Sequence, residues 1–470
     1  MIEYSNLNLN CEGNMRITLD KVPALLKSRK TLKPKLRTTM TPPRQTTFRQ
    51  ALLALLKRNL GGNYVASPMN YKDFAKSAFE KMMDVLAVDD WRAILASMDK
   101  IRPDEQLITE WEKFQNPSTL SALERMVPDH ILEEVSKSMD DYEFILKAAP
   151  KAATDAKPVT VYPTVQTVMF HNKRVNAFFG PLMREANTRL LKVLRPEVLF
   201  NKGKNLNDIE LHLSATMMGS ETTTIIENDF SDYDRSQKEV AFCLDEIALD
   251  YLGLNPDDLD MWMSGHYKHS NINFSLGLKV NLMYQRKSGD VTTAFLNTVL
   301  NMTALVFGLN LGRNELVSAM FLGDDSWLQL KKSSDLRTRV LQCSTRIAVH
   351  FNGEAKTAYF NTGYFCGYYI LNDAEGVKLA ADPIKRSVKL GRWDVKNIAA
   401  LKENWISFGD LMRNYDNEIV QEKLAEAVVE RTPLATYGQI KLLVEALNSL
   451  KNSYKEFRNM YDSHVTTTVY

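Results

Sequence analysis

Two adjacent carboxylates, Asp324 and Asp325, follow Gly323 within the otherwise apolar segment 317–330. Apolar runs on both sides of a tight acidic turn predict a β-hairpin that carries both carboxylates at its tip. Carboxylate oxygens are the ligands that Mg²⁺ prefers, and Mg²⁺ usually keeps water or a substrate phosphate in its coordination shell. The turn is therefore a candidate metal site for chemistry on phosphates, provided that other segments supply further ligands.

A second acidic segment carries Asp229 and Asp234. The β-branched residues of 222–226 predict a buried strand with Asp229 at its end, and apolar residues recur at helical spacing in 238–252. A strand, an acidic loop and a helix in this order would aim Asp229 at a metal ion held by Asp324. Two metal ions can stabilise the attacking and leaving oxygens of a phosphoryl transfer. The alternative interpretation is a solvated turn in which Asp234 caps the following helix.

The segment 288–298 combines a Ser288-Gly289 pair with Thr293 and Asn297. Gly289 allows a flexible bend in the backbone. Thr293 and Asn297 are four residues apart, so on a helix they would share one face. A hydroxyl and an amide on one face can form hydrogen bonds with a ribose hydroxyl. The alternative is an ordinary helix start with capping hydroxyl groups.

These three segments together resemble motifs A, B and C of viral RNA-dependent RNA polymerases, in the order that this family carries them. The resemblance is closest to the alphavirus-like group and, within it, to tobamovirus-like replicases. It extends over about residues 40–420. Supporting stretches lie at 162–181, 284–293, 352–356, 363–367, 382–385 and 389–391.

The resemblance implies an α+β right-hand polymerase with helical fingers, a palm built on an antiparallel sheet, and a helical thumb. The implied activity is RNA-directed RNA polymerisation, which replicates and transcribes a positive-strand RNA virus genome by two-metal nucleotidyl transfer. The implied units are a basic N-terminal segment at 1–60, fingers at 61–220, a palm at 221–375 that includes a fingers insertion at 253–286, and a thumb at 376–470.

The resemblance also assigns roles to the acidic and polar residues. Asp229 and Asp324 would hold two Mg²⁺ ions, with Mn²⁺ able to substitute, and Asp325 would support the second ion. Asp234, Thr293 and Asn297 would select ribose over deoxyribose. Ser288 and Gly289 belong to the same implied nucleotide-binding motif.

Four basic residues receive roles in the same way. Lys147 and Lys151 match the basic motif of the nucleotide channel, and Arg184 lies downstream in the same region; ammonium and guanidinium groups suit a triphosphate. Lys356 matches the lysine that the family is thought to use as a general acid toward pyrophosphate, which requires a pKa near the working pH. The alternatives are that Lys147 and Lys151 only solubilise a loop, and that Lys356 is an exposed lysine on a strand edge.

The composition of the 470-residue chain is that of a soluble globular protein, with 44% hydrophobic and 25% charged residues and a net charge of +2. The charge is uneven, because residues 1–60 hold 12 Lys or Arg against 3 Asp or Glu. This segment would contact an RNA backbone or a partner, or it is a solvated basic tail. The four cysteines lack a CxxC pair, which fits a reducing compartment, and Cys243 is expected in the core. His266 and His269 have no neighbouring zinc ligands in the sequence.

Several helices are expected to hold these motifs in place. The spacing of apolar residues predicts helices at 46–60, within 71–98, at 183–194 and in the C-terminal part, where a stripe runs from Ile440 to Phe457. Residues 148–158 read as a flexible basic loop, followed by a strand at 160–170.

The sequence also limits location and partners. No apolar run reaches the length of about 18 residues that spans a membrane, and the N-terminus lacks a signal peptide. No phosphate-binding loop of the GxxxxGK[ST] type occurs, so a helicase or capping activity would belong to a partner. By resemblance the chain acts in replication complexes of the host cytoplasm, with an RNA template and product, ribonucleoside triphosphates and a viral helicase or capping protein. Contact with membranes would occur only through such partners.

Three other functions share parts of this pattern. A reverse transcriptase would use the same paired aspartates, but Asp234 together with Thr293 and Asn297 favours ribonucleotides. A non-catalytic RNA-binding scaffold would share the basic N-terminus, although it has no need of the complete set of carboxylates. An unrelated metal-dependent phosphohydrolase would cleave phosphate bonds without a template.

Overall fold

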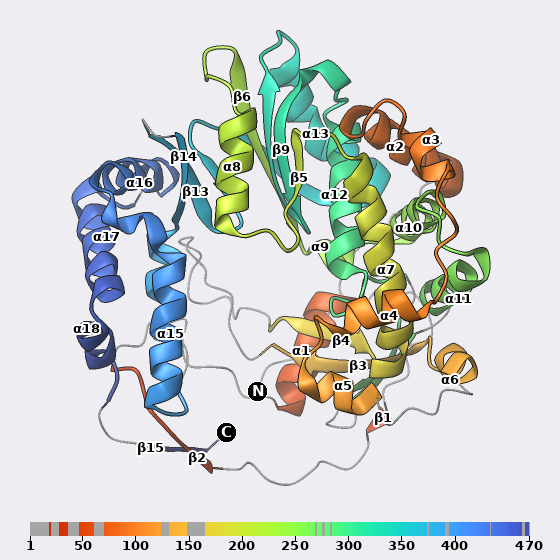
Figure 1. Ribbon diagram of the computed structural model, residues 1–470, viewed down its shortest axis with the longest axis horizontal. Coiled ribbons are helices and arrows are strands. Elements are labelled where there is room, and N and C mark those ends of the chain that lie inside the picture. Colours follow the sequence, from red (N-terminus) through yellow and green to blue (C-terminus); the bar gives the residue numbers. More distant parts are fainter. Residues whose placement is uncertain are drawn as a thin grey trace, which may run out of the picture.

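The structure, a computed structural model, describes residues 18–19, 28–35, 47–60, 70–123, 131–147, 165–267, 270–274, 278–282, 284–373, 376–390, 394–432, 434–462 and 466–469. In these parts of the chain, helices pack around two five-stranded sheets; a three-stranded sheet lies beside one of them, and a two-stranded sheet lies apart from both (Figure 1). The α+β fold class predicted from the sequence is confirmed. None of the described helices is long and apolar enough to cross a membrane.

The central sheet contains the predicted acidic segments. Its strands, in spatial order, are β11 (Glu354–Phe360), β6 (Thr223–Ser231), β10 (Asp325–Lys331), β9 (Leu316–Leu322) and β5 (Val198–Phe200). The first four pair antiparallel, whereas β5 pairs parallel with β9. The prediction of an antiparallel sheet is therefore wrong at this edge. The chain between β5 and β9 is long, so no tight turn forces the two strands to run in opposite directions.

Alternate residues of the central sheet enter two different cores, as expected for the two faces of a pleated sheet. On one face, Phe321 and Leu328 belong to the large core, and on the other face Met320 and Trp327 pack in a smaller one. Helices of the large core include α2 (Tyr71–Leu86), α10 (Glu239–Tyr251), α12 (Thr293–Gly308) and α13 (Leu336–Phe351). The smaller core is completed by α8 (Leu206–Thr216) and by the three-stranded sheet. Both faces of the sheet are thus covered.

The second five-stranded sheet joins segments that are far apart in the sequence. Its order is β1 (Thr18–Leu19), β8 (Leu278–Leu282), β7 (Ser270–Phe274), β3 (Asp141–Leu146) and β4 (Thr167–His171). Residues between the two acidic motifs therefore return to the strands at 141–171 instead of extending the central sheet. Helix α1 (Phe48–Leu55) packs on this sheet through Ala51 and Leu55, and a π-helical turn at Leu56–Leu60 ends the predicted helix.

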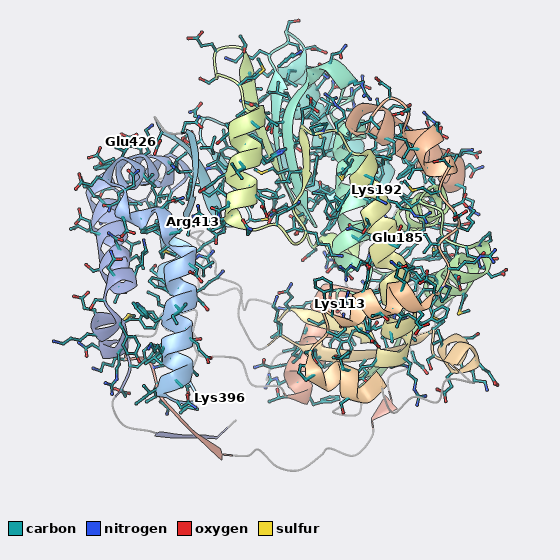
Figure 2. The ribbon with its side chains drawn as sticks, viewed as in Figure 1. Lys113, Glu185, Lys192, Lys396, Arg413 and Glu426 are labelled. Carbon is teal, nitrogen blue, oxygen red and sulfur yellow. The ribbon has the colours of Figure 1, made fainter. Side chains whose placement is uncertain are left out.

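The helices predicted within 71–98 are confirmed as α2 and α3 (Trp91–Ala96). Helix α7 (Lys173–Val193) starts ten residues before the predicted helix at 183–194 and contains Pro181 in its interior. Arg189 of this helix is buried and forms an ion pair with Glu185. Glu185 and Lys192 mark this helix in Figure 2. The remaining helices of this half are α4 (Glu105–Glu112), α5 (Pro117–Leu123), α6 (Ile131–Lys137) and α11 (Pro256–Tyr267).

The C-terminal part forms its own core. The three-stranded sheet consists of β12 (Gly363–Phe365), β13 (Tyr368–Asp373) and β14 (Gly376–Ala381), so the expected boundary between palm and thumb at 375/376 falls inside the β13–β14 hairpin. The helices that follow are α14 (Pro383–Leu390), α15 (Ile398–Leu411), α16 (Glu418–Arg431), α17 (Tyr437–Asn452) and α18 (Tyr454–Asn459). Arg413, labelled in Figure 2, pairs with Glu210 of α8 and connects these helices to the central sheet. Strand β15 (Thr466–Val469) pairs with β2 (Ser28–Thr31), so segments near both ends of the chain lie side by side.

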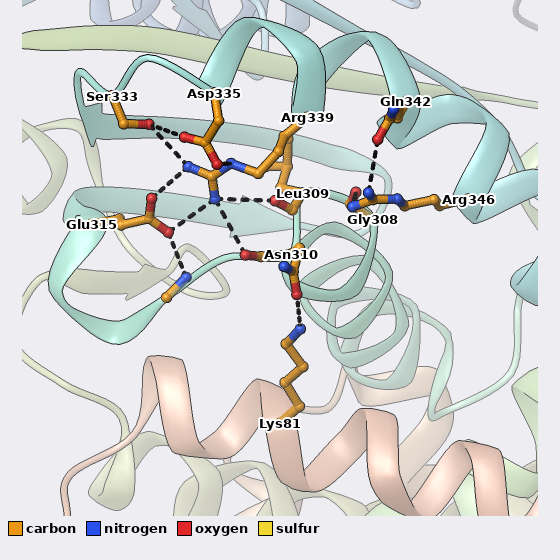
Figure 3. A network of polar contacts seen from close by, with 11 residues as sticks. Lys81, Gly308, Leu309, Asn310, Glu315, Ser333, Asp335, Arg339, Gln342 and Arg346 are labelled. Carbon is orange, nitrogen blue, oxygen red and sulfur yellow. Dashed lines mark hydrogen bonds and ion pairs between the residues drawn. The ribbon is translucent and has the colours of Figure 1, made fainter.

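The buried side chain of Arg339 holds the C-terminal end of α12 in place (Figure 3). The guanidinium of Arg339, on α13, donates to the carbonyls of Leu309 and Asn310, which follow α12. It also pairs with Glu315, just before β9, and with Asp335. Because one side chain holds α12, α13 and the start of β9, the helix and the acidic hairpin keep a fixed relation.

Candidate active site

The predicted acidic hairpin is confirmed. Leu322 and Asp325 pair across the strands, which leaves Gly323 and Asp324 as the two residues of the turn. Gly323 has a φ of 60°, and an added Cβ atom would meet nothing within 4 Å. Glycine is therefore required for the backbone conformation at the first turn position, and not for close packing.

Two side chains of α12 form hydrogen bonds with the backbone of this turn. The hydroxyl oxygen of Thr298 accepts a hydrogen bond from the backbone N–H of Gly323 at 2.8 Å. The amide of Asn301 donates to the carbonyls of Gly323 and Asp325 at 3.0 and 3.2 Å. Both side chains are buried. The sequence analysis did not identify them, although a threonine and an asparagine three residues apart in an apolar helix were a visible signal.

Asp229 lies in β6, next to the acidic turn. β6 pairs with β10 in a register that places Ser326 opposite Asn228, one residue away from both Asp325 and Asp229. The prediction that Asp229 ends its strand is wrong, because β11 continues the pairing of β6 as far as Ser231. The side chain of Asp229 is exposed.

The carboxylates of Asp229, Asp234 and Asp325 are near enough to Asp324 to repel its charge. Burial, together with repulsion from Asp325, Asp229 and Asp234, raises the pKa of Asp324 to about 6. In the described parts of the chain, no group of three or more His, Cys, Asp or Glu side chains is arranged to hold a metal ion as the side chains stand. The donor set nevertheless fits a hard divalent cation, because it consists of oxygen ligands whose mutual repulsion a cation would relieve.

The structure brings Asp234 and Asn297 together. Asp234 is the second residue of the short helix α9 (Tyr233–Ser236), and its carboxylate accepts a hydrogen bond from the Asn297 amide at 2.9 Å. The alternative that Asp234 caps the next helix is wrong, since α10 begins after Lys238. Thr293 is the first residue of α12, and its hydroxyl donates to the carbonyl of Lys287 at 2.7 Å.

The Ser288-Gly289 pair packs against β4. The Ser288 hydroxyl donates to the carbonyl of Thr167, and the N–H of Gly289 donates to the carbonyl of Met169. A Cβ atom at Gly289 would lie 2.9 Å from that same oxygen. The predicted reason for this glycine, a flexible bend, is therefore replaced by close approach of two backbones.

The structure places three of the four basic residues. Lys356 lies on the edge strand β11, where its position in the register is directly opposite Asp229. Lys147 is exposed at the end of β3. Arg184 donates to the carbonyl of Glu110 at 3.0 Å and stacks over the Phe114 ring at 3.9 Å, so its guanidinium is engaged with α4 and the turn after it. Lys151 lies outside the described residues.

The turn between β12 and β13 touches the acidic hairpin. Cys366, with a φ of 51°, donates from its thiol to the Asp325 carboxylate at 3.5 Å. Burial, followed by repulsion from Asp325, raises the pKa of this thiol. The Tyr364 hydroxyl donates to Asp382 and accepts from Lys385 at 2.6 Å. The segment 363–367, one of the stretches that support the resemblance, is thus in contact with an acidic residue of the hairpin.

A partly buried ion pair connects β6 to the C-terminal helices. Arg431, the last residue of α16, donates to both carboxylate oxygens of Glu227, at 2.9 and 2.6 Å. The backbone N–H of Tyr364 also donates to Glu227, at 2.6 Å. Burial raises the pKa of Glu227, whereas Arg431 opposes this shift. Glu227 precedes Asp229 by two residues, so this pair anchors the strand that carries the metal-ligand candidate.

Comparison with known proteins identifies the family. The family model described as RNA dependent RNA polymerase matches residues 4–459. The chain belongs to this family. This chain is 30% identical to the replicase large subunit of Youcai mosaic virus over 435 residues, which cover 92% of this chain and 26% of the viral protein.

Two further replicase large subunits show the same relation. The protein of Pepper mild mottle virus (strain Spain) is 31% identical over 420 residues, covering 89% of this chain and 25% of its own. The protein of Odontoglossum ringspot virus (isolate Korean Cy) is 30% identical over 444 residues, covering 93% and 27%. This chain thus spans about a quarter of the length of these relatives. The resemblance to tobamovirus-like RNA polymerases expected from the sequence is confirmed.

Proposed function

We propose that the chain is an RNA-directed RNA polymerase that replicates and transcribes the genome of a positive-strand RNA virus. The observation that supports this most is the carboxylate cluster. Repulsion from Asp325, Asp229 and Asp234 contributes to the raised pKa of Asp324 in the β9–β10 turn, and Asp234 is hydrogen-bonded to Asn297. A family member with both features has the groups needed to bind metal-complexed triphosphates and to recognise their sugar.

Asp229 and Asp324 would hold Mg²⁺, for which Mn²⁺ can substitute, and Asp325 would support the second ion. Bound metal ions stabilise the charge on the attacking and leaving oxygens of a phosphoryl transfer. The buried bonds from Thr298 and Asn301 fix the turn beforehand, so the carboxylates need little rearrangement when substrate arrives.

In the reaction, the 3′ hydroxyl of the growing RNA loses its proton and forms a bond to the α-phosphate of the incoming nucleotide. The bond between the α- and β-phosphates breaks, and pyrophosphate leaves. Asp234 and Asn297 would hold the ribose hydroxyls, with Thr293 nearby at the start of the same helix. Lys356 would give a proton to the leaving pyrophosphate, and Lys147, Lys151 and Arg184 would guide the triphosphate toward the site.

The proposed layout is fingers at 61–220 with the insertion 253–286, a palm at 221–375, and a thumb at 376–470, preceded by the basic segment 1–60. The pairing of β7 and β8 with β3 supports the assignment of the insertion to the fingers. The β13–β14 hairpin packs in two cores, because Ile370 and Leu379 face the central sheet whereas Tyr369 and Leu371 pack with α16 and α17, so it joins the proposed palm to the proposed thumb. The proposed partners are template and product RNA, ribonucleoside triphosphates and a viral helicase or capping protein in cytoplasmic replication complexes.

The deciding experiment is templated extension of RNA with Mg²⁺, comparing the wild type with Asp324→Asn. A polymerase extends the product only with the complementary ribonucleotide, and the variant does not. Preference for deoxyribonucleotides would indicate a reverse transcriptase. RNA cleavage or phosphate release without a template would indicate a phosphohydrolase, and RNA binding without either reaction would indicate a scaffold.

A further inference from the structure

A continuous line of five polar side chains runs from the nucleotide site into the core. The Asn297 amide donates to Asp234 at 2.9 Å, and the Gln237 amide donates to the Asn297 oxygen at 2.9 Å. The Arg286 guanidinium donates to the Gln237 oxygen at 2.7 Å and to one oxygen of Asp245 at 2.9 Å, and it forms an ion pair with the other Asp245 oxygen at 2.7 Å. We propose that Gln237, Arg286 and Asp245 are positioning residues that fix the orientation of the Asn297 amide and thereby set the selectivity for ribose.

The two charged ends determine the direction of every bond in this line. A guanidinium can only donate and an ionised carboxylate can only accept. Arg286 therefore requires the oxygen of Gln237, which leaves the Gln237 N–H₂ group facing Asn297. Asn297 must then turn its oxygen toward Gln237 and its N–H₂ group toward Asp234. An amide is nearly symmetric in shape, so without such a line nothing in the packing would separate its two orientations.

The orientation matters because it determines what the substrate meets. With its oxygen held by Gln237, Asn297 directs its N–H₂ group to Asp234. In the reversed orientation, the Asn297 oxygen would face the Asp234 carboxylate and both groups would repel. The hydroxyl of Tyr233 also donates to the backbone carbonyl of Asn297, at 2.9 Å, which fixes the position of the residue while leaving its amide free to turn.

Three of these side chains, Gln237, Arg286 and Asp245, are almost completely buried. Gln237 and Arg286 are 1% exposed, and Asp245 is 2% exposed. A buried ion pair contributes little net stability compared with apolar residues of similar size, because both charges lose their hydration. Buried ion pairs are best known for selecting one conformation among several. Here the pair of Arg286 and Asp245 would select one orientation of the Gln237 and Asn297 amides.

This inference rests on the proposed polymerase function, and its test uses the whole chain. Gln237→Glu keeps an acceptor for Arg286 but removes the donor toward Asn297. The Asn297 amide should then reverse. We expect the efficiency ratio of a ribonucleotide over its 2′-deoxy counterpart, measured by single-turnover templated addition, to fall about tenfold to a hundredfold. RNA affinity should not change.

Gln237→Met removes both bonds at similar volume and should give a smaller loss of the same ratio. The matched control is Gln329→Met, which removes another glutamine that is 2% exposed and bonded to Met218 and Thr223. That control should lower the melting temperature and leave the ratio unchanged.

The outcomes separate this inference from the proposed function. If the wild type adds no nucleotide to a templated RNA, the proposed function fails, and the inference fails with it. If the wild type extends RNA but Gln237→Glu and Gln237→Met lower both nucleotides equally, the proposed function stands and the inference is overturned. If both variants fail to fold while Gln329→Met folds, the line is a structural support, which also overturns the inference.

Discussion

Lys356 and Asp229 lie directly opposite each other on the antiparallel strands β11 and β6. Side chains at directly opposed positions share one face of a sheet, with Cβ atoms about 4.5–5.5 Å apart. The edge strand therefore places an ammonium group beside the carboxylate that is expected to bind metal. This relation gives the proposed proton donor a fixed place, which the sequence alone could only assign by resemblance.

Lys356→Arg tests that role, because arginine keeps the charge but does not readily release its proton. We expect single-turnover addition of one ribonucleotide to slow by about 10²–10⁴-fold if proton transfer limits the rate, and by less if a conformational step does. RNA affinity should be unchanged. Lys331→Arg, at an exposed lysine on β10, serves as the control and should have no effect. A wild-type rate for Lys356→Arg between about pH 6 and pH 9 would exclude Lys356 as the general acid.

Asp324→Asn should abolish nucleotide addition, with a loss of at least about 10³-fold, because an amide is a neutral and poorer ligand for Mg²⁺. The fold should persist, since the substitution removes one of four mutually repelling carboxylates. Circular dichroism and the melting temperature would verify the fold in the same preparation. Robust extension by the folded variant would contradict the assignment of Asp324 as a metal ligand.

Thr298→Val tests whether α12 positions the acidic turn. Valine has nearly the same shape but leaves the buried N–H of Gly323 without its acceptor, at a cost of about 1–3 kcal/mol. We expect nucleotide addition to slow by about 10–100-fold, because a small displacement of catalytic groups is costly. Thr303→Val is the matched control, since the buried Thr303 hydroxyl bonds only to Val299 of the same helix among the contacts described. Equal effects of both substitutions on the rate would show that the bond to Gly323 has no special role.

Lys287→Met should change how stability depends on pH. Burial, opposed by Asp290 and aided by Arg286, lowers the pKa of Lys287 from 10.5 to about 7. Between these pH values the folded chain binds fewer protons than the unfolded chain, so wild-type stability rises as pH increases from about 7 to 10.5. The penalty for burying the charge is complete below about pH 7, and Lys287→Met removes it.

The variant should therefore exceed the wild type in free energy of unfolding by up to about 5 kcal/mol near pH 6. The difference should shrink as the pH approaches 10. Urea denaturation at several pH values measures it, with Lys331→Met as the exposed control. A difference that is constant with pH would show that Lys287 is not forced to carry its charge in the core.

Features with a local signal were predictable from the sequence. The apolar runs on both sides of Gly323 predicted the hairpin, and the helical spacing of apolar residues predicted α10, because each pattern depends only on neighbouring residues. The parallel edge strand β5 had no such signal, since its direction is determined by pairing with β9, more than a hundred residues later. The same holds for the bond between Gln237 and Arg286, which are 49 residues apart.

Thr298 and Asn301 illustrate a different limit. A threonine and an asparagine in an apolar helix indicate buried polar groups that need hydrogen-bond partners. Their partners are backbone atoms of the acidic turn, which approaches α12 only in the folded chain. Gly289 was predicted to be important for the wrong reason, because the approach of β4 cannot be read from its neighbours in the sequence.

The ion pair of Glu227 and Arg431 has a consequence for any attempt to shorten the protein. The two residues are 204 positions apart, yet Arg431 compensates a carboxylate in the same strand as Asp229. Removing one partner of this partly buried pair leaves the other without compensation, at a cost of about 1–3 kcal/mol. We therefore expect a minimal catalytic fragment to need all of α16, and a truncation that stops before Arg431 to disturb the strand of Asp229 although it removes none of the proposed metal ligands.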